Sequence, residues 1–197
     1  MNSDRKKWGA SEWLAEGIRC FHLPDGMKAV QALNRSIEIS PEHRESNGDT
    51  AYFYLGKIYE VEGRLEGAAE LYSKALTLWP EDEESLIGRG SCFYARGDYD
   101  RAIADFEKVL SVPQDQRNVS PPELYYGLAM SWSQKGEYRK AAEFAKKAID
   151  ESPDYDEYVY HLKNVIKSDS SAIPDESVYL MQYKKLLAEM EMKLAGN

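Results

Sequence analysis

Side chains that could bind a metal or support catalysis are few in this sequence and lie far apart. The three histidines, His22, His43 and His161, have no second ligand at the spacing that a metal site uses. Asp98 and Asp100 alternate as in a calcium loop, but the glycine and distal glutamate of such a loop are missing. We therefore expect no metal, no cofactor and no enzymatic activity, and we interpret Asp98 as the start of a helix.

The composition is that of a folded, acidic protein. The 197 residues include 34 Asp and Glu against 25 Lys and Arg, a formal net charge of −9. This charge argues against a nucleic-acid or anionic-membrane surface, because phosphate binding depends on Lys and Arg. No run approaches the ~20 apolar residues that span a bilayer, and the start does not read as a secretory signal. Two cysteines, Cys20 and Cys92, do not suggest a disulfide framework. We expect a cytoplasmic protein, with Cys92 as an unreactive core thiol.

One pattern of large and small residues recurs along the chain at helical spacing. Its clearest copy reads Tyr52-x-x-Leu55-Gly56-x-x-Tyr59, followed by Gly63, Ala68, Tyr72, Ala75 and Pro80. The small residue of each copy falls at 17, 56, 90 and 129, in steps of 39, 34 and 39 residues. Large apolar residues at intervals of three and four form a buried helical face, and small residues let two helices approach closely. The pattern predicts paired helices.

Glycine and proline mark the expected ends of these helices. Gly63, Gly97 and Gly136 fall where the first helix of a pair must end, and we expect a left-handed backbone there. Two of the steps contain five extra residues, within 42–48 and 114–121, between one pair and the next. These insertions are interpreted either as tolerated surface loops or as an edge that contacts a partner.

The pattern resembles the tetratricopeptide repeat (TPR), a helix–turn–helix motif of 34 residues. The match covers roughly 10–153 as four pairs, within 10–43, 49–82, 83–116 and 122–155, between an N-terminal tail of 1–9 and a C-terminal region of 154–197. The resemblance implies an all-α solenoid of antiparallel pairs, wound into a right-handed superhelix with C-terminal capping helices. Glu16 and Arg89 depart from the pattern, since they stand at the place of Leu55 and Leu128.

The resemblance also implies that a ligand lies along the concave face, which residues of the first helices line. In this chain these places are mostly aromatic and aliphatic, as in exposed apolar strips that mark binding surfaces. The predicted partner-binding groove consists of Leu14, Ile18, Phe53, Tyr54, Lys57, Ile87, Tyr94, Tyr126 and Met130. The alternative is that the chain's own termini bury some of these residues.

One function of TPR proteins can be tested on the residues themselves. TPR co-chaperones that grip the C-terminal carboxylate of heat-shock chaperones use Lys, Asn and Arg at set places in the groove. Only Lys57 is of that kind here, and Glu84 and Glu123 at other groove places would repel a carboxylate. We instead expect a segment with apolar anchors.

The C-terminal region leaves the repeat pattern. Residues 156–167 predict one more helix, 168–171 a polar connector, and Pro174 the start of a final helix. Apolar residues of the final helix alternate by three and four: Leu180, Tyr183, Leu187, Met190 and Leu194. Three uses of this seam stay open, namely capping the last pair, joining a homodimer, and filling the chain's own groove as an internal ligand.

The sequence therefore predicts a non-catalytic protein-protein interaction module, an adaptor or scaffold that binds a peptide or protein segment in its groove. Two alternatives are a dedicated chaperone for one client, as in the TPR chaperones of bacterial secretion systems, and a structural protein that self-assembles through its C-terminal helix. The expected partner is a protein or peptide, and neither a nucleic acid nor a membrane.

Overall fold

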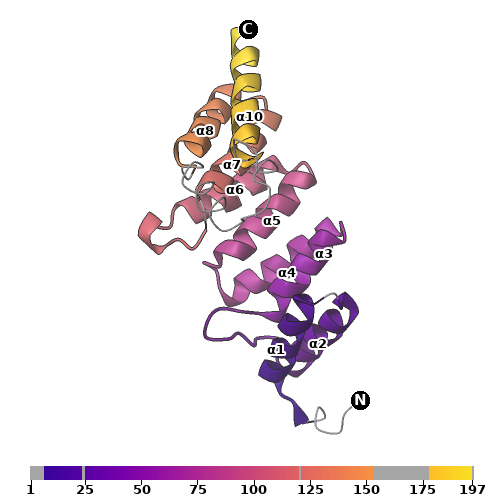
Figure 1. The fold of residues 1–197 in the computed structure, drawn as a ribbon. Coiled ribbons are helices and arrows are strands. Elements are labelled where there is room, and N and C mark those ends of the chain that lie inside the picture. The colour runs from indigo at the N-terminus through magenta and orange to yellow at the C-terminus, as the bar shows by residue number, and fades with distance from the viewer. Residues whose placement is uncertain (1–6, 24, 120, 153–177, 197) are drawn as a thin grey trace, which may run out of the picture. The chain divides into compact units, whose positions relative to one another are not determined.

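The structure, a computed structural model of the chain, describes residues 7–23, 25–119, 121–152 and 178–196. These residues form helices joined by turns, with no strand among them (Figure 1). The predicted all-α class is therefore confirmed. The described chain divides into two compact units, unit 1 over 1–112 and unit 2 over 113–197, and each is considered by itself. The helix expected over 156–167 and the connector after it lie outside the described residues.

Unit 1 consists of three antiparallel helix pairs. They are α1 (Ala10–Phe21) with α2 (Gly26–Ile39), α3 (Ala51–Val61) with α4 (Leu65–Leu78), and α5 (Glu83–Ala95) with α6 (Tyr99–Leu110). The first helix of each new pair packs against both helices of the pair before it, so α3 contacts α2 and α1, and α5 contacts α4 and α3. Each pair thus covers the flank of its predecessor.

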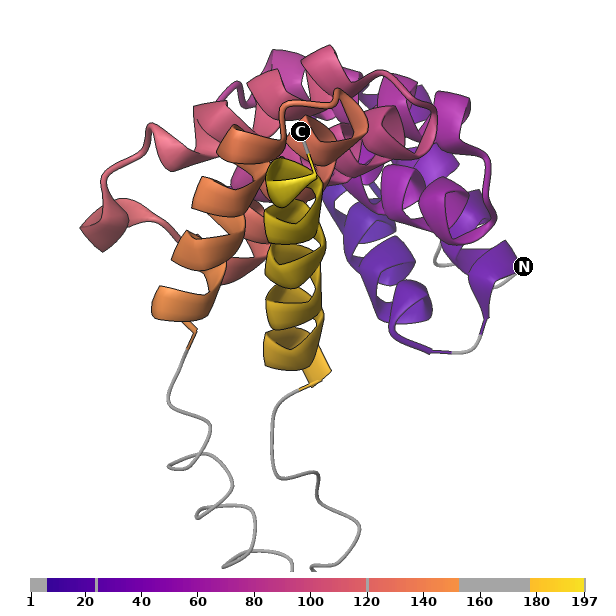
Figure 2. The same ribbon diagram turned by 90° about the horizontal axis from the view of Figure 1, so that it is seen from above.

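Unit 2 contains one such pair and a helix that comes from much later in the chain. A short 3-10 helix, η2 (Gln114–Gln116), precedes α7 (Pro121–Gln134) and α8 (Tyr138–Asp150), and the unit ends with α10 (Val178–Ala195). α10 lies alongside α8 and also contacts α7 (Figure 2). It therefore takes the place on this pair that α5 takes on α3 and α4.

Local signals explain where the helices begin and end. Gly63, Gly97 and Gly136 have φ angles of 73°, 80° and 79°, so the left-handed turns expected from the sequence are confirmed. The Asp98 carboxylate accepts a hydrogen bond from the backbone N–H of Arg101 and caps α6, in agreement with its interpretation as a helix start.

A tyrosine between two glycines sets the spacing between the second and third pairs. Tyr72 of α4 is 1% exposed, and its ring lies against Gly56 of α3 and Gly88 of α5. A Cβ atom would come within 2.8 Å of this ring at Gly56 and within 2.5 Å at Gly88, closer than packed atoms come. The two glycines therefore provide the space that the buried tyrosine occupies.

The two charged residues that depart from the repeat pattern are paired with opposite charges. Arg89 donates from Nε and Nη2 to both carboxylate oxygens of Asp105 on α6, at 2.8 and 2.7 Å, and from Nη1 to Ser73 of α4 at 3.1 Å. Since the Asp105 side chain is only 8% exposed, a two-pronged ion pair replaces apolar packing here.

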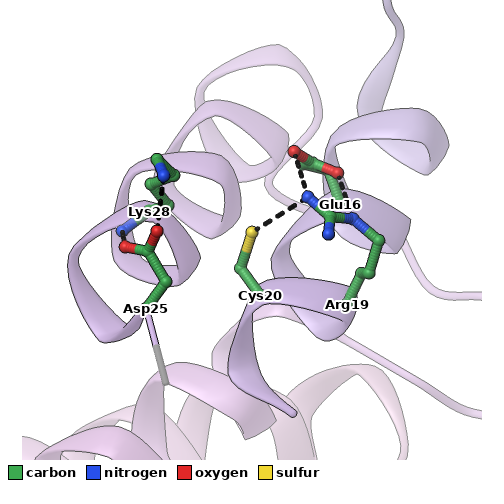
Figure 3. Close-up of polar contacts among 5 residues, drawn as sticks. All are labelled: Glu16, Arg19, Cys20, Asp25 and Lys28. Carbon is green, nitrogen blue, oxygen red and sulfur yellow. Dashed lines mark hydrogen bonds and ion pairs between the residues drawn. The ribbon is translucent and has the colours of Figure 1, made fainter. Parts of the chain in front are cut away.

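Glu16, the other residue that departs from the repeat pattern, is paired with a residue of the same helix, α1 (Figure 3). Glu16 accepts hydrogen bonds from Nε and Nη2 of Arg19 at 2.8 and 2.9 Å, and Nη2 also lies 3.6 Å from the Sγ of Cys20. Nearby, the Lys28 ammonium bonds Asp25 at 2.5 Å and holds the pKa of that carboxyl below its usual value. Both contacts are local to the first pair, and the exposure of the Asp25–Lys28 ion pair makes its contribution to stability small.

Candidate interaction surface

The predicted groove residues of the first pair have different surroundings. Leu14 is fully buried in a core cluster with Leu33 of α2 and Leu55 of α3. The prediction that Leu14 lines a binding surface is therefore wrong, because the neighbouring helices cover it. Ile18, one turn later, is half-buried and packs on the edge of the same cluster, as Tyr54 of α3 does.

Three aromatic residues form a row that runs from α1 to α3. They lie on the side of unit 1 that the first helices of its pairs, α1, α3 and α5, form, and we call this side the first-helix face. The ring of Phe21 meets Tyr54 edge to face at 5.4 Å, and Tyr54 meets Phe53 edge to face at 5.0 Å. Phe21 and Tyr54 are half-buried, whereas Phe53 is 8% exposed and backs the row from beneath. Lys57 extends its Nζ to 5.6 Å from the Phe53 ring centroid. We call Phe21, Tyr54 and Phe53 the aromatic row.

Phe21 was missed by the sequence analysis. The repeat frame assigns groove places by position in each first helix, and Phe21 is the last residue of α1, outside those places. A cross-pair search for aromatic residues at helix ends would have identified it. Of the other predicted residues in unit 1, Ile87 is half-buried on α5, and Tyr94, also half-buried, lies 5.7 Å from the Tyr99 ring of α6.

Carboxylates accept hydrogen bonds from the tyrosines at this face. The hydroxyl of Tyr54 donates to Asp49 at 3.0 Å, and the hydroxyl of Tyr72 donates to Glu60 at 2.6 Å. Burial raises the pKa of both phenols, and the adjoining carboxylates raise it further. Both tyrosines are therefore neutral hydrogen-bond donors.

The start of α5 adds two further acids to the same region. Asp82, the N-cap residue, accepts a hydrogen bond from the hydroxyl of Ser85, and Glu84 is exposed in the first turn. Burial raises the pKa of Asp82, and the charge of Asp49 adds to this effect. The negative charges of Asp82 and Glu84 also help to raise the pKa of Tyr54, so the two acids lie near the aromatic row.

In unit 2, the C-terminal helix covers the predicted groove residues. The ring of Tyr126 lies 5.0 Å from that of Tyr183 on α10, and Met130 packs on the same cluster. Leu186 and Met190 of α10 are buried against three alanines of α7 and α8: Ala129, Ala141 and Ala145. The chain's own terminus thus shields part of the surface that the sequence assigned to a partner.

The five seam residues of α10 are not equivalent. Tyr183 and Met190 are 3% and 1% exposed, Leu180 and Leu187 are half-buried, and Leu194 is 40% exposed. The buried residue Leu186 stands outside the seam predicted from the sequence. The side of α10 that faces away from the pair carries Met181 and Met192, which are 53% and 67% exposed.

A cleft lies on another side of unit 1, where α4 meets α5 and α6. Its volume is about 420 Å³, and it is lined by Glu66, Ala69, Glu70, Ser73, Lys74, Phe93, Arg96 and Arg101. Arginines pair with the acids around it, since Arg96 bonds Glu66 at 3.2 Å and Arg101 bonds Asp98. The sequence analysis did not find this cleft, because it assigned binding places to the first helices alone, whereas α4 and α6 supply much of this lining.

The described residues offer little for metal or thiol chemistry. No group of three or more His, Cys, Asp or Glu side chains gathers there as metal ligands would. Cys92 is fully buried, and burial raises the pKa of its thiol to about 11, so it stays protonated near neutral pH. No helix in the described part of the chain is long and apolar enough to cross a membrane.

Comparisons with known proteins agree with this architecture. Two family models described as tetratricopeptide repeat match residues 50–82 and residues 78–119 and 87–156. A curated relative, the TPR repeat-containing protein MJ1428 of Methanocaldococcus jannaschii, is 26% identical over 91% of this chain but only 31% of its own length. The chain thus spans about a third of that relative.

Two solved structures share the fold at low sequence identity. MamA from Desulfovibrio magneticus RS-1 superposes with a TM-score of 0.63 and 20% identity, over 93% of this chain and 96% of that one. The type III secretion chaperone SycD of Yersinia enterocolitica, in complex with a peptide of the translocator YopD, gives a TM-score of 0.53 and 19% identity over 72% of this chain and 91% of that one.

Proposed function

Because the chain belongs to the tetratricopeptide-repeat family, we propose that it is a non-catalytic protein-protein interaction module that binds a peptide or protein segment on the first-helix face of unit 1. The aromatic row carries this proposal. Phe21 and Tyr54 leave part of each ring open to solvent, held edge to face at 5.4 Å. Half-buried tyrosine and phenylalanine provide large contact area at small entropy loss, as aromatic anchors of interfaces do.

Unit 2 contributes less binding surface in this proposal. Tyr126 and Met130 already pack against α10, so a ligand that reached them would have to displace or share that helix. We therefore assign α10 to capping the last pair, with Tyr183 and Met190 as the residues that hold it. The surface of unit 1 is left as the principal site.

The peptide-bound SycD structure supports binding of a peptide by this kind of fold. It also favours the second candidate, a dedicated chaperone that keeps one client protein soluble. The two candidates differ in the partner. A chaperone's client precipitates when it is made without the chaperone, whereas an adaptor's partner stays in solution by itself.

The test uses the full chain as bait in extracts of the cells that make it, with captured proteins identified by mass spectrometry. Tyr54→Ala should reduce the recovery of specific partners about tenfold or more, as loss of an aromatic anchor does. The matched control is Tyr52→Ala. Tyr52 lies on the same helix and is also half-buried, but its ring lies against Lys74 of α4.

Helical circular dichroism must be the same in both variants for the comparison to be valid. Tyr54→Phe separates the two roles of the residue, because it keeps the ring and loses only the hydrogen bond to Asp49. If Tyr54→Ala and Tyr52→Ala recover the same partners in the same amounts, the aromatic row is not the binding surface.

A further inference from the structure

We infer, building on the function proposed above, that the segment bound at the aromatic row carries Lys or Arg side chains beside its apolar anchors. Four carboxylates around the row would select it: Asp49, Glu60, Asp82 and Glu84. The partner is thus a basic amphipathic segment of another protein. Apolar contact with Phe21 and Tyr54 provides one part of the recognition, and charge complementarity provides the other.

Geometry brings these carboxylates to one face of unit 1. Asp49 accepts a hydrogen bond at 3.0 Å from the hydroxyl of Tyr54, the middle residue of the row. Glu60 accepts the Tyr72 hydroxyl at 2.6 Å, and a Cβ at Gly88 would lie 2.8 Å from that same hydroxyl.

Helical periodicity places the acids of α5 beside these two. Glu84 stands four residues before Gly88, one turn away on the same side of α5. Glu60 and Glu84 therefore flank one position. Asp82 stands at the N-cap position of the helix that carries Glu84, and its carboxylate accepts a hydrogen bond from the Ser85 hydroxyl.

These four acids have no cationic partner among the residues that the structure describes. Their hydrogen bonds come from hydroxyls, amides and the backbone, and Lys57, a cation on α3, extends over the Phe53 ring instead. Other acids of the same unit are paired: Glu66, Asp98 and Asp105 are each bonded by an arginine. The four acids around the aromatic row thus carry charge that no cation among the described residues neutralises.

Such an arrangement favours a cationic ligand for two reasons. Like charges held close together near apolar rings repel one another, and a Lys or Arg from the ligand relieves that repulsion and forms charge-assisted hydrogen bonds. The negative field also attracts a basic segment from a distance and speeds association, while it opposes an acidic one. Glu84 is the acid most open to such a contact, because it is exposed whereas the other three are half-buried.

A display library of random 12-residue peptides, selected on the full-length protein, tests the inference. Peptides that depend on Tyr54 should be enriched in Lys and Arg next to Leu, Phe or similar anchors. The most enriched peptide is then synthesised and titrated by fluorescence anisotropy. Its dissociation constant should rise about tenfold between about 50 mM and about 300 mM salt, because screening weakens the attraction.

Charge reversal distinguishes this face from the general acidity of the protein. Glu84→Lys should raise the dissociation constant of the selected peptide at least about tenfold, because one attraction is lost and one repulsion is gained. The matched control is Glu107→Lys, the same charge change at an exposed position of α6, and it should change binding by less than about twofold.

The outcomes separate the inference from the function on which it rests. Neutral or acidic peptides that depend on Tyr54 would overturn the inference alone. Equal effects of Glu84→Lys and Glu107→Lys would overturn it too, since the attraction would then be unspecific. If the selected peptides bind equally well to Tyr54→Ala, or if no peptide is selected above background, the result counts instead against the proposed surface. A dimer in light scattering that dissociates with Glu84→Lys would make a second copy of this chain the occupant and refute a separate partner.

Discussion

The two units of the molecule cover the flank of a helix pair in different ways. In unit 1, the flank of α3 and α4 is covered by α5, which follows α4 after a short turn and fits through Gly88 against Tyr72. In unit 2, the flank of α7 and α8 is covered by α10, which begins far beyond the end of α8 in the chain and packs through Tyr183, Leu186 and Met190. A small-to-large match between consecutive pairs does in one unit what a unique apolar helix does in the other.

This difference has a consequence for recognition. In unit 1, Tyr54 stays half-buried, with its hydroxyl on Asp49, and no helix of the described residues packs on it as α10 packs on Tyr126. The unique solution places an aromatic residue, Tyr183, directly on Tyr126. The proposed binding surface therefore lies on unit 1, whereas the corresponding residues of unit 2 are covered by α10.

The largest expected effect concerns the ion pair that binds α5 to α6 in unit 1. Arg89→Ala leaves the Asp105 carboxylate buried without its partner and should destabilise unit 1 by about 4 kcal/mol. Native-state hydrogen exchange followed by mass spectrometry should show faster exchange in α5 and α6, with α7 and α8 unchanged. The double change Arg89→Leu with Asp105→Ala should recover most of the loss, since Leu occupies this place in two other pairs. Equal acceleration in both units would show that they unfold together.

The apolar helix of unit 2 is tested by Met190→Ala. This residue is 1% exposed, and its truncation should destabilise unit 2 by about 3 kcal/mol through loss of buried area and creation of a cavity. Exchange should accelerate in α7, α8 and α10, while α1 to α4 keep their wild-type rates. Met192→Ala is the matched control, because Met192 is 67% exposed and its truncation should have no measurable effect.

The close approach in unit 1 is tested by Gly88→Ala. The added methyl group would lie 2.5 Å from the Tyr72 ring, so α4 and α5 must separate, at a loss of about 2 kcal/mol. Urea unfolding followed by circular dichroism measures the change. Gly26→Ala, at a position with no neighbouring atom within 4 Å, should leave the midpoint unaltered or raise it slightly. Equal effects at both glycines would mean that helix propensity, and not close packing, sets the change.

The smallest expected effect concerns Asp82, one of the four acids around the aromatic row. Because folding raises the pKa of Asp82, the folded state holds a proton there more tightly than the unfolded chain does. The Asp82 contribution to stability therefore falls as pH rises from the unfolded pKa, near 3.8, through the raised folded pKa. Asp82→Asn removes this component. The difference in melting temperature between the Asp82→Asn variant and the wild-type protein should shift in favour of the variant as pH rises from about 4 to about 6. A constant difference would contradict this expectation.

How much could be predicted from the sequence depends on how local each feature is. The pairs and their turns were predictable, because Gly63, Gly97 and Gly136 act within a single turn and the repeat shows them three times. The partner of Arg89 was not, since Asp105 lies 16 residues away on another helix and no repeat position signals it. The position of α10 stayed open because its seam fits a cap, a dimer or an internal ligand equally well.

The candidate site follows the same rule. Tyr54 and Ile18 were predicted from their places in the repeat, and both are half-buried at the edge of the same core cluster. Leu14 occupies a groove place in the repeat but is buried against Leu33. The repeat pattern predicts which side of a helix a residue lies on, but it does not predict which neighbouring residues cover that side. Phe21 lies at a helix end, where the frame assigns no role.

The distant origin of α10 affects the order in which the protein can fold during synthesis. In unit 1, the first two pairs are each covered as soon as the first helix of the next pair emerges from the ribosome. The apolar flank around Ala129 and Ala145 must wait until Met190 has been made, about 40 residues after the end of α8. At roughly 5–20 residues per second, that surface stays open for several seconds in every new chain. It is therefore the part of the molecule where a nascent polypeptide would most need protection from aggregation.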